Sequence, residues 1–211
     1  MDFEKDPKKI KELSNYDGII VPGGFGSRGI EGILKTIEYA RKNNIPYFGL
    51  CYGMQLMVIE YARNVLGLKD ANTREVNPSS KNIVIDIMED QKDKIEKKDM
   101  GGSMRLGAYP ASLKKGTVAY KAYGKGETSE RHRHRYEVNN AYKEAIEEAG
   151  LVFSGLSPDG KLCEIAELPT IKHPFFLGTQ FHPEFKARPL SPHPLFTAFI
   201  KACQKVKKNT K

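Results

Sequence analysis

Cys51 stands where a short apolar segment is predicted to turn directly into a helix. A glycine lies two residues before it and another two residues after it, at Gly49 and Gly53. Small residues on both sides allow the strained turn that lifts a nucleophile above the end of a sheet. The position also places the sulfur at a helix N-terminus, whose partial positive charge favours the thiolate. Cys51 is therefore predicted to be a nucleophile, although an arbitrary cysteine is more often a small buried hydrophobe.

A thiolate nucleophile needs a base, and His182 follows directly after a predicted apolar strand. Glu184, two residues later, is suited to hold one tautomer of the imidazole, as the third member of a catalytic triad does. His173 and His193 also precede proline, but neither is followed by a carboxylate, and both are interpreted as turn residues. The pattern therefore predicts a Cys-His-Glu set.

A glycine-rich segment, PGGFG at residues 22–26, ends an earlier predicted strand. Backbone N–H groups of such a loop can stabilise an oxyanion, and one donor contributes roughly 3 to 4 kcal/mol in comparable enzymes. A phosphate-binding loop is the alternative, but no Gly-Lys-Ser/Thr follows, and the glycines do not continue in a dinucleotide-binding pattern. An oxyanion-binding loop is therefore favoured.

Strands and helices are predicted to alternate on both sides of Cys51. Short apolar runs that end in Gly or Pro predict buried strands, and apolar residues at helical spacing predict helices. The predicted order is a strand at 17–22, a helix at 31–43, a strand at 47–50 and a helix at 53–65. This order favours a parallel sheet with helices on its faces. Because such sheets carry their sites at the carboxyl ends of the strands, Cys51 and His182 are expected to meet there.

The second half of the chain is predicted to be less regular. Its elements are a strand at 82–88, a charged loop at 89–100, short strands within 101–113 and 117–123, an Asn-capped helix at 141–149, a hairpin of 151–156 with 162–168, a strand at 175–180 and a helix at 195–206. With no repeat or linker, one α/β domain over residues 1–211 is predicted. It should have three layers, with a mostly parallel central sheet, flanking helices and a small antiparallel section.

The composition is that of an ordinary globular domain, with 39% hydrophobic and 28% charged residues among 211. No stretch approaches the ~20 apolar residues that a membrane helix needs, and the polar N-terminus does not resemble a signal peptide. The three cysteines are odd in number and far apart, which argues against a disulfide framework. A cytoplasmic protein with no membrane partner is expected.

The formal net charge of +8 would attract anions, including nucleic acid. Part of the excess lies in the run RHRHR at residues 131–135 and in the C-terminal tail. The chain has no Trp, and no aromatic residues alternate with the basic ones to stack on bases. A solvated charge run is therefore favoured over a nucleic-acid site, which would show a steep salt-dependent affinity.

Three motifs in this order, PGGFGSRG, GLCYGMQ and FHPEF, resemble class I (triad) glutamine amidotransferases. Further strings, EYARNVLGLKDANTREV, GGSMRLG, ERHRHRYEVNN and HPLFTAFIKA, resemble the glutaminase domains of CTP synthases within that class. The resemblance covers nearly all of the chain from about Tyr16 onward. It implies hydrolysis of glutamine to glutamate and ammonia through a γ-glutamyl thioester. The ammonia would serve the ATP-dependent amination of UTP to CTP in pyrimidine nucleotide biosynthesis.

The resemblance assigns roles to particular residues. Cys51 would attack the glutamine amide, His182 would act as base and then as acid, and Glu184 would orient His182. The residues that would bind L-glutamine are Gly24, Tyr52, Gly53, Met54, Gln55, Glu75 and Arg135. Of these, Glu75 suits the α-ammonium group and Arg135 the α-carboxylate. Arg105, in GGSMRLG, would belong to a lid that responds to the effector GTP.

The sequence departs from the family pattern in three places. Tyr52 stands where the family more often has leucine, which should be tolerated because mainly the backbone N–H is needed there. The synthetase half is absent, so the chain is expected to be a fragment, a separate domain or a split subunit. The start is expected to be short by one strand–helix unit, ~30 residues.

The resemblance also implies how cofactors and subunits would be divided. No cofactor or metal is expected in this domain, whereas ATP and Mg²⁺ would serve the synthetase domain, and the full-length enzyme would be a homo-oligomer. A different class of function stays open. The chain would then be a catalytically silent module that binds a synthetase partner or a nucleotide. Intact Cys51, His182 and Glu184 weigh against this alternative.

Overall fold

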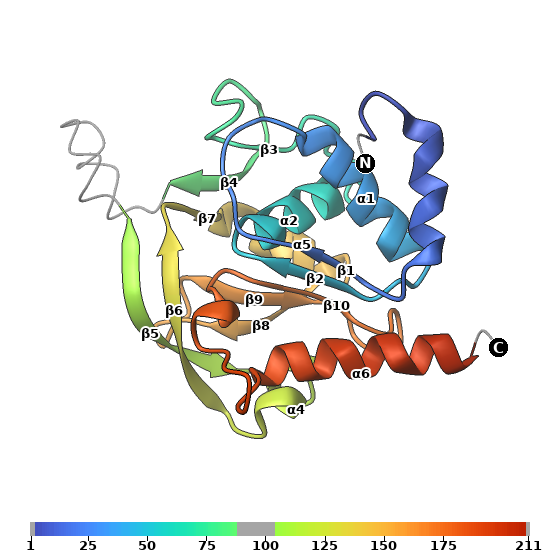
Figure 1. Cartoon of the computed structure of the whole chain (residues 1–211). Helices are drawn as coiled ribbons and strands as arrows, with labels where there is room; N and C mark the ends of the chain where they lie inside the picture. The colour runs from blue at the N-terminus through green and yellow to red at the C-terminus, as the bar shows by residue number, and fades with distance from the viewer. Residues whose placement is uncertain (1–2, 88–103, 210–211) are drawn as a thin grey trace.

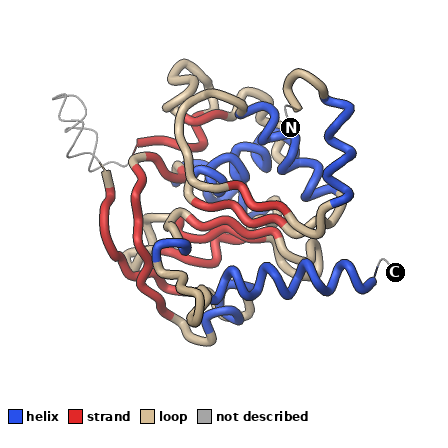
Figure 2. The backbone as a smooth tube through the Cα atoms, in the orientation of Figure 1, coloured by secondary structure: helices blue, strands red, loops and turns tan. Residues whose placement is uncertain are grey.

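A computed structural model describes residues 3–87 and 104–209 of the chain (Figure 1). The charged loop predicted at 89–100, and the start of GGSMRLG, lie outside these residues. Two sheets and the helices around them make up the described part (Figure 2). No helix in this part combines the length and the apolar character that crossing a bilayer requires.

Seven strands form the main sheet, in the spatial order β1-β2-β10-β9-β8-β5-β6. In chain order they are β1 (Ile19–Val21), β2 (Tyr47–Leu50), β5 (Arg105–Leu113), β6 (Glu127–His134), β8 (Val152–Leu156), β9 (Cys163–Glu167) and β10 (Phe176–Thr179). Strand β2 is parallel to both of its neighbours, β1 and β10. The pairs from β10 through β9, β8 and β5 to β6 are all antiparallel.

The α/β class and the flanking helices are confirmed, but the sheet is mixed rather than mostly parallel. The antiparallel section is larger than predicted because β5, β6, β8 and β9 all pair antiparallel, and β8 and β9 are joined by a short turn. Strands that are joined by a tight turn can only pair antiparallel, whereas a parallel pair needs a long crossover. The predicted hairpin of residues 151–156 with 162–168 is confirmed as β8 and β9.

A second, three-stranded sheet lies beside the first. It contains β3 (Asn72–Thr73), β4 (Ile83–Ile87) and β7 (Tyr136–Val138), in the order β3-β4-β7. The strand predicted at 82–88 is β4. Since β7 follows β6 after a single residue, the chain passes from one sheet to the other beside the predicted glutamine-binding Arg135.

Helices cover both faces of the main sheet (Figure 1). One face packs against α1 (Ile30–Lys42), α2 (Tyr52–Asn64) and α5 (Lys143–Glu148), with a core that includes Ile37, Met57 and Ile146. The other face packs against α4 (Val118–Tyr123) and α6 (Pro194–Asn209), with Phe48, Leu177 and Phe199 in its core. The described residues also contain the 3-10 helices η1 (Pro7–Asn15), η3 (Asn140–Tyr142) and η4 (Pro183–Phe185).

The helices predicted near 31–43, 53–65, 141–149 and 195–206 are present, but the strand predicted at 117–123 is wrong. That segment is α4. The Thr117 side chain accepts a hydrogen bond from the Tyr120 N–H, and Gly124 ends the helix with φ +68°. An N-cap threonine and a left-handed C-terminal glycine stop a helix at both ends. These caps favour a helix over the predicted strand.

Candidate active site

Cys51 occupies a strained turn between β2 and α2, as predicted. Its φ is +50°, a conformation that non-glycine residues rarely adopt and that clusters at functional sites. A Cβ at Gly49 would come within 2.6 Å of the Gly53 carbonyl carbon, and one at Gly53 within 2.3 Å of the Val21 carbonyl oxygen. Both flanking glycines are therefore required by close backbone approach, and the turn holds the sulfur at the N-terminus of α2.

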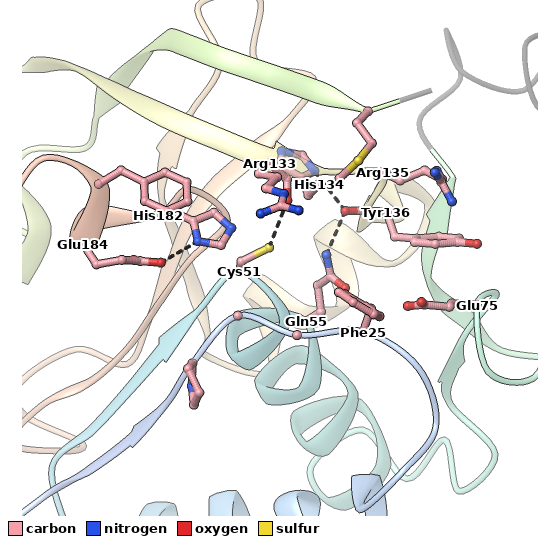
Figure 3. A pocket seen from close by; sticks show the side chains of 15 residues that line it. Phe25, Cys51, Gln55, Glu75, Arg133, His134, Arg135, Tyr136, His182 and Glu184 are labelled. Atoms are coloured by element: carbon pink, nitrogen blue, oxygen red, sulfur yellow. Dashed lines mark hydrogen bonds and ion pairs between the residues drawn. The ribbon is translucent and has the colours of Figure 1, made fainter. Parts of the chain in front are cut away.

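His182 lies three residues after the end of β10 and is the N-cap of η4. Its Nδ1 is 2.6 Å from Oε1 of Glu184, and its ring stacks on Phe185 with the centroids 4.6 Å apart. Figure 3 shows the other ring nitrogen turned toward the sulfur of Cys51. The structure thus brings the three predicted residues together, with the carboxylate on one side of the imidazole and the thiol on the other.

The electrostatic surroundings of His182 favour its protonated form. Burial by itself would lower the pKa of His182, but hydrogen bonding and charge interaction with Cys51 and Glu184 outweigh burial and raise the pKa to about 9. An imidazolium beside the sulfur can stabilise a thiolate and later give its proton to a leaving group.

The glycine-rich loop lies against the triad. A Cβ at Gly23 would come within 2.8 Å of His182 Cε1 and 3.7 Å of Cys51 Cβ, so only glycine fits there without displacing the imidazole. Further along the loop, Gly26 is held at both of its polar groups. Its N–H donates to Glu75 Oε1 over 3.1 Å, and its carbonyl accepts from the Tyr52 hydroxyl.

A pocket of about 560 Å³ opens above the sulfur. Of the predicted glutamine-binding residues, Gly24, Gln55, Glu75 and Arg135 line it. Figure 3 shows Glu75 and Arg135 together at the end of the pocket away from His182. The other lining residues are Pro22, Gly23, Phe25, Cys51, Met104, Arg133, His134, Tyr136, His182, Glu184 and Phe185.

Three predicted glutamine-binding residues do not line the pocket. Tyr52 lies beneath the glycine-rich loop, where its ring packs near Gly24. Gly53 abuts the backbone of β1, and Met54 is fully buried in the core. Successive residues of a helix point in different directions, so α2 turns only Gln55 of this run into the pocket. Their side chains thus lie outside the pocket, and their role in glutamine binding stays a prediction.

Arg105 is buried within the described part of the chain. It is 7% exposed, and its Nη1 is 2.8 Å from Oε1 of the buried Glu164. Burial raises the pKa of Glu164 to about 7, although Arg105 opposes this shift. The Arg105 guanidinium also lies over the Tyr109 ring. These contacts give Arg105 a structural role within the described part of the chain, and its role in a GTP lid stays a prediction.

The run RHRHR is not solvated along its whole length. Residues 131–134 of the run lie in β6, where the histidines His132 and His134 are buried and the arginines Arg131 and Arg133 are exposed. The alternation of side chains along a strand explains this pattern and was the signal that could have found it. The backbone of the same strand reaches the site, because the Arg133 carbonyl lies 3.9 Å from Cys51 Sγ and accepts from the thiol.

Two buried glutamines near the sulfur complete the site. Gln180 is fully buried, and its Nε2 is 3.7 Å from Cys51 Sγ. Gln55 Nε2 is in turn 3.3 Å from the side-chain oxygen of Gln180. Sequence reasoning missed Gln180, although its place between a buried strand and the His182 turn was a usable signal. Within residues 3–87 and 104–209, no group of three or more His, Cys, Asp or Glu side chains is arranged to hold a metal ion.

Comparison with known proteins agrees with the fold. The sequence model for the family described as "Glutamine amidotransferase class-I" matches residues 1–202. The chain therefore belongs to the class-I glutamine amidotransferase family. Within that family it is similar to CTP synthases.

Two relatives and one solved structure illustrate the similarity. The CTP synthase of Carboxydothermus hydrogenoformans is 58% identical over 98% of this chain, and that of Geobacter sulfurreducens is 61% identical over 90%. The aligned regions make up 37% and 34% of those two proteins, so the chain spans little more than a third of their length. The Trypanosoma brucei CTPS glutaminase domain, solved with bound acivicin, is 42% identical with a TM-score of 0.87, covering 94% of this chain and 75% of that one.

Proposed function

We propose that this chain hydrolyses L-glutamine to glutamate and ammonia. The observation that carries the proposal is the arrangement of Cys51 at a strained turn, beside an imidazole whose Nδ1 lies 2.6 Å from the Glu184 carboxylate. A thiol, a base and a group that orients the base, at the mouth of one pocket, are the parts of a nucleophilic hydrolase.

The proposed reaction has two halves. The Cys51 thiolate attacks the side-chain carbonyl carbon of glutamine, while His182 holds the thiol proton as imidazolium. The oxyanion that forms accepts hydrogen bonds from backbone N–H groups at Gly24 and at the start of α2, which the helix leaves unsatisfied. The C–N bond breaks as His182 protonates the departing ammonia, leaving a γ-glutamyl thioester. His182 then takes a proton from water, and the hydroxide releases glutamate and the thiol.

Charge in the pocket supports an amino-acid substrate. Glu75 and Arg135 lie at the end away from His182 (Figure 3). A carboxylate suits the α-ammonium group and a guanidinium the α-carboxylate, which would direct the side-chain amide toward the sulfur. The Glu75 carboxylate is already oriented by the Gly26 N–H, so it needs little rearrangement on binding.

The ammonia is proposed to serve CTP synthesis. The chain is similar to CTP synthases over nearly its whole length, but it aligns with only 37% of the Carboxydothermus hydrogenoformans CTP synthase. Both facts support a glutaminase domain that works with a synthetase domain. In this proposal ATP and Mg²⁺ act in the synthetase domain, where UTP is aminated to CTP. A regulatory effect of GTP would depend on the two domains together.

The test measures glutamate release from glutamine by the chain, with and without the synthetase domain of a CTP synthase. We expect Cys51→Ala to abolish release, and Cys163→Ala, a change at a buried cysteine in β9, to leave it intact. A glutamine-mimicking chloroketone provides a second measurement that needs no partner, because mass spectrometry should locate its adduct on Cys51. Full release by Cys51→Ala, or an adduct only elsewhere, would disprove the proposed nucleophile.

A further inference from the structure

Gln180 approaches the nucleophile from the protein interior. It follows β10, its backbone N–H donates to the Glu164 carbonyl, and its side chain is fully buried. It does not line the pocket, so it does not reach the substrate side of the sulfur. Yet its Nε2 lies 3.7 Å from Cys51 Sγ. A buried amide next to a nucleophile, on the side away from substrate, has no part in the reaction described above.

The neighbouring groups determine which end of the Gln180 amide faces the sulfur. The Tyr136 carbonyl can only accept, and the group 2.8 Å from it is Gln55 Nε2. The donor end of Gln55 is therefore fixed, and the same NH₂ group donates to Gln180 Oε1 over 3.3 Å. Since the oxygen of Gln180 faces Gln55, its NH₂ group must face Cys51.

Cys51 Sγ thus lies between two groups with opposite preferences. The Arg133 carbonyl, at 3.9 Å, accepts a hydrogen bond and so interacts with the neutral thiol. The Gln180 amide donates a hydrogen bond and so interacts best with the anion, because hydrogen bonds to ionised acceptors are about twice as strong as neutral ones. As the proton moves to His182, the sulfur exchanges the first contact for the second.

We propose that Gln180 is a thiolate-stabilising residue of this active site, oriented by Gln55. It donates an N–H to the Cys51 thiolate from the buried side, first when the thiol proton moves to His182 and again when the thioester breaks down and the thiolate leaves. This role rests on Cys51 being the nucleophile proposed above. It adds a donor from the end of β10 to the contribution of the α2 N-terminus.

The test measures the rate of Cys51 alkylation by iodoacetamide as a function of pH, without glutamine, so a failure of glutamine hydrolysis does not affect the readout. The variant is Gln180→Met, which keeps the length of the side chain and removes the N–H. We expect the midpoint of the pH–rate curve to rise by about one pH unit, with alkylation below the midpoint about tenfold slower. The other charged and titratable side chains that line the pocket are unchanged in the variant: Glu75, Arg133, His134, Arg135, Tyr136, His182 and Glu184.

Thr179→Val is the matched control. It changes a fully buried neighbour whose hydroxyl donates to the Phe181 carbonyl, and because successive residues of a strand face opposite ways, it should not move the midpoint. Gln180→Glu provides a second variant of nearly the same shape should the methionine variant not fold. Its carboxylate beside the sulfur should raise the midpoint further. A midpoint that stays within about 0.3 pH units in a folded Gln180 variant overturns the proposal.

Discussion

Three His-Pro pairs in this chain have the same local sequence but different partners. His173 and His193 each use Nδ1 to accept the backbone N–H of the residue two positions on. The residue two positions after His182 is Glu184, and here Nδ1 contacts its side-chain carboxylate instead of its backbone N–H. The first two histidines stabilise their own turns, as predicted for turn residues. In His182, Nδ1 contacts the Glu184 carboxylate and Nε2 faces the sulfur of Cys51. The carboxylate at position 184 is therefore the local feature that distinguishes this candidate base from the two turn histidines.

Replacing Glu184 with Gln tests how the carboxylate affects His182. An imidazolium is needed to protonate ammonia, so activity of the unchanged chain should fall as the pH rises through the His182 pKa of about 9. A neutral amide at position 184 removes the negative charge of Glu184, which is one of the contributions that raise this pKa. The alkaline limb of kcat/KM for glutamine should therefore move to lower pH, together with a lower maximum rate.

The control for this prediction is Glu38→Gln on α1. Glu38 pairs with Lys42 on the helix surface, and its loss should leave the pH profile unchanged. An alkaline limb that stays in place in Glu184→Gln would show that the carboxylate does not set the protonation of His182.

At the scale of elements, the glycine-rich loop is positioned by two side chains from elsewhere in the chain. Tyr52 on α2 holds the Gly26 carbonyl, and Glu75, after β3, holds the Gly26 N–H. Family members more often have leucine at position 52, which could not make the first of these bonds. The Tyr52 hydroxyl and the Glu75 carboxylate together form a clamp that holds the loop carrying Gly23 and Gly24.

Tyr52→Phe should loosen this loop without changing the packing of the ring. Loss of one hydrogen bond of ~1 kcal/mol predicts a decrease in kcat/KM of about fivefold, because the backbone donors for the oxyanion would be less well placed. Tyr142→Phe is the control, since that hydroxyl bonds Asn82 in a different part of the chain. Equal activity in Tyr52→Phe and the unchanged chain would show that the clamp does not position the loop.

At the scale of the whole molecule, the site depends on a sheet that is packed on both faces. Strand β2 contributes to both cores, because Tyr47 faces α2 while Phe48 packs with Phe175 and Phe199 beneath α6. The carboxyl end of β2 carries Cys51, and the carboxyl end of the parallel β10 leads to His182. Two strands held in register by two cores therefore set the spacing of the triad.

Phe48→Ala tests this packing. The ring is fully buried, so its loss should lower the free energy of unfolding by about 3–5 kcal/mol through lost burial and the cavity left behind. Phe25→Ala removes the same ring from a side chain that is 86% exposed, and its effect should stay within about 0.5 kcal/mol. Urea unfolding followed by circular dichroism measures both. Similar losses in the two variants would contradict the assignment of the second core.

The sequence by itself determined what depends on neighbours along the chain. The turn at Cys51, the Pro183-Glu184 continuation after His182 and most helices were predictable because caps, glycines and apolar spacing act within a few residues. The sequence motifs also indicated the family. The same local reasoning failed at 117–123, where the capping residues were overlooked.

Tertiary structure alone decided which distant segments meet. The order of strands in the mixed sheet brought β6 beside the sulfur, buried His132 and His134, and placed Arg105 in an ion pair with Glu164. It also put Gln180 within reach of Cys51. These outcomes depend on pairing between strands far apart in sequence, where many arrangements satisfy local preferences and only the packing of the whole chain selects one.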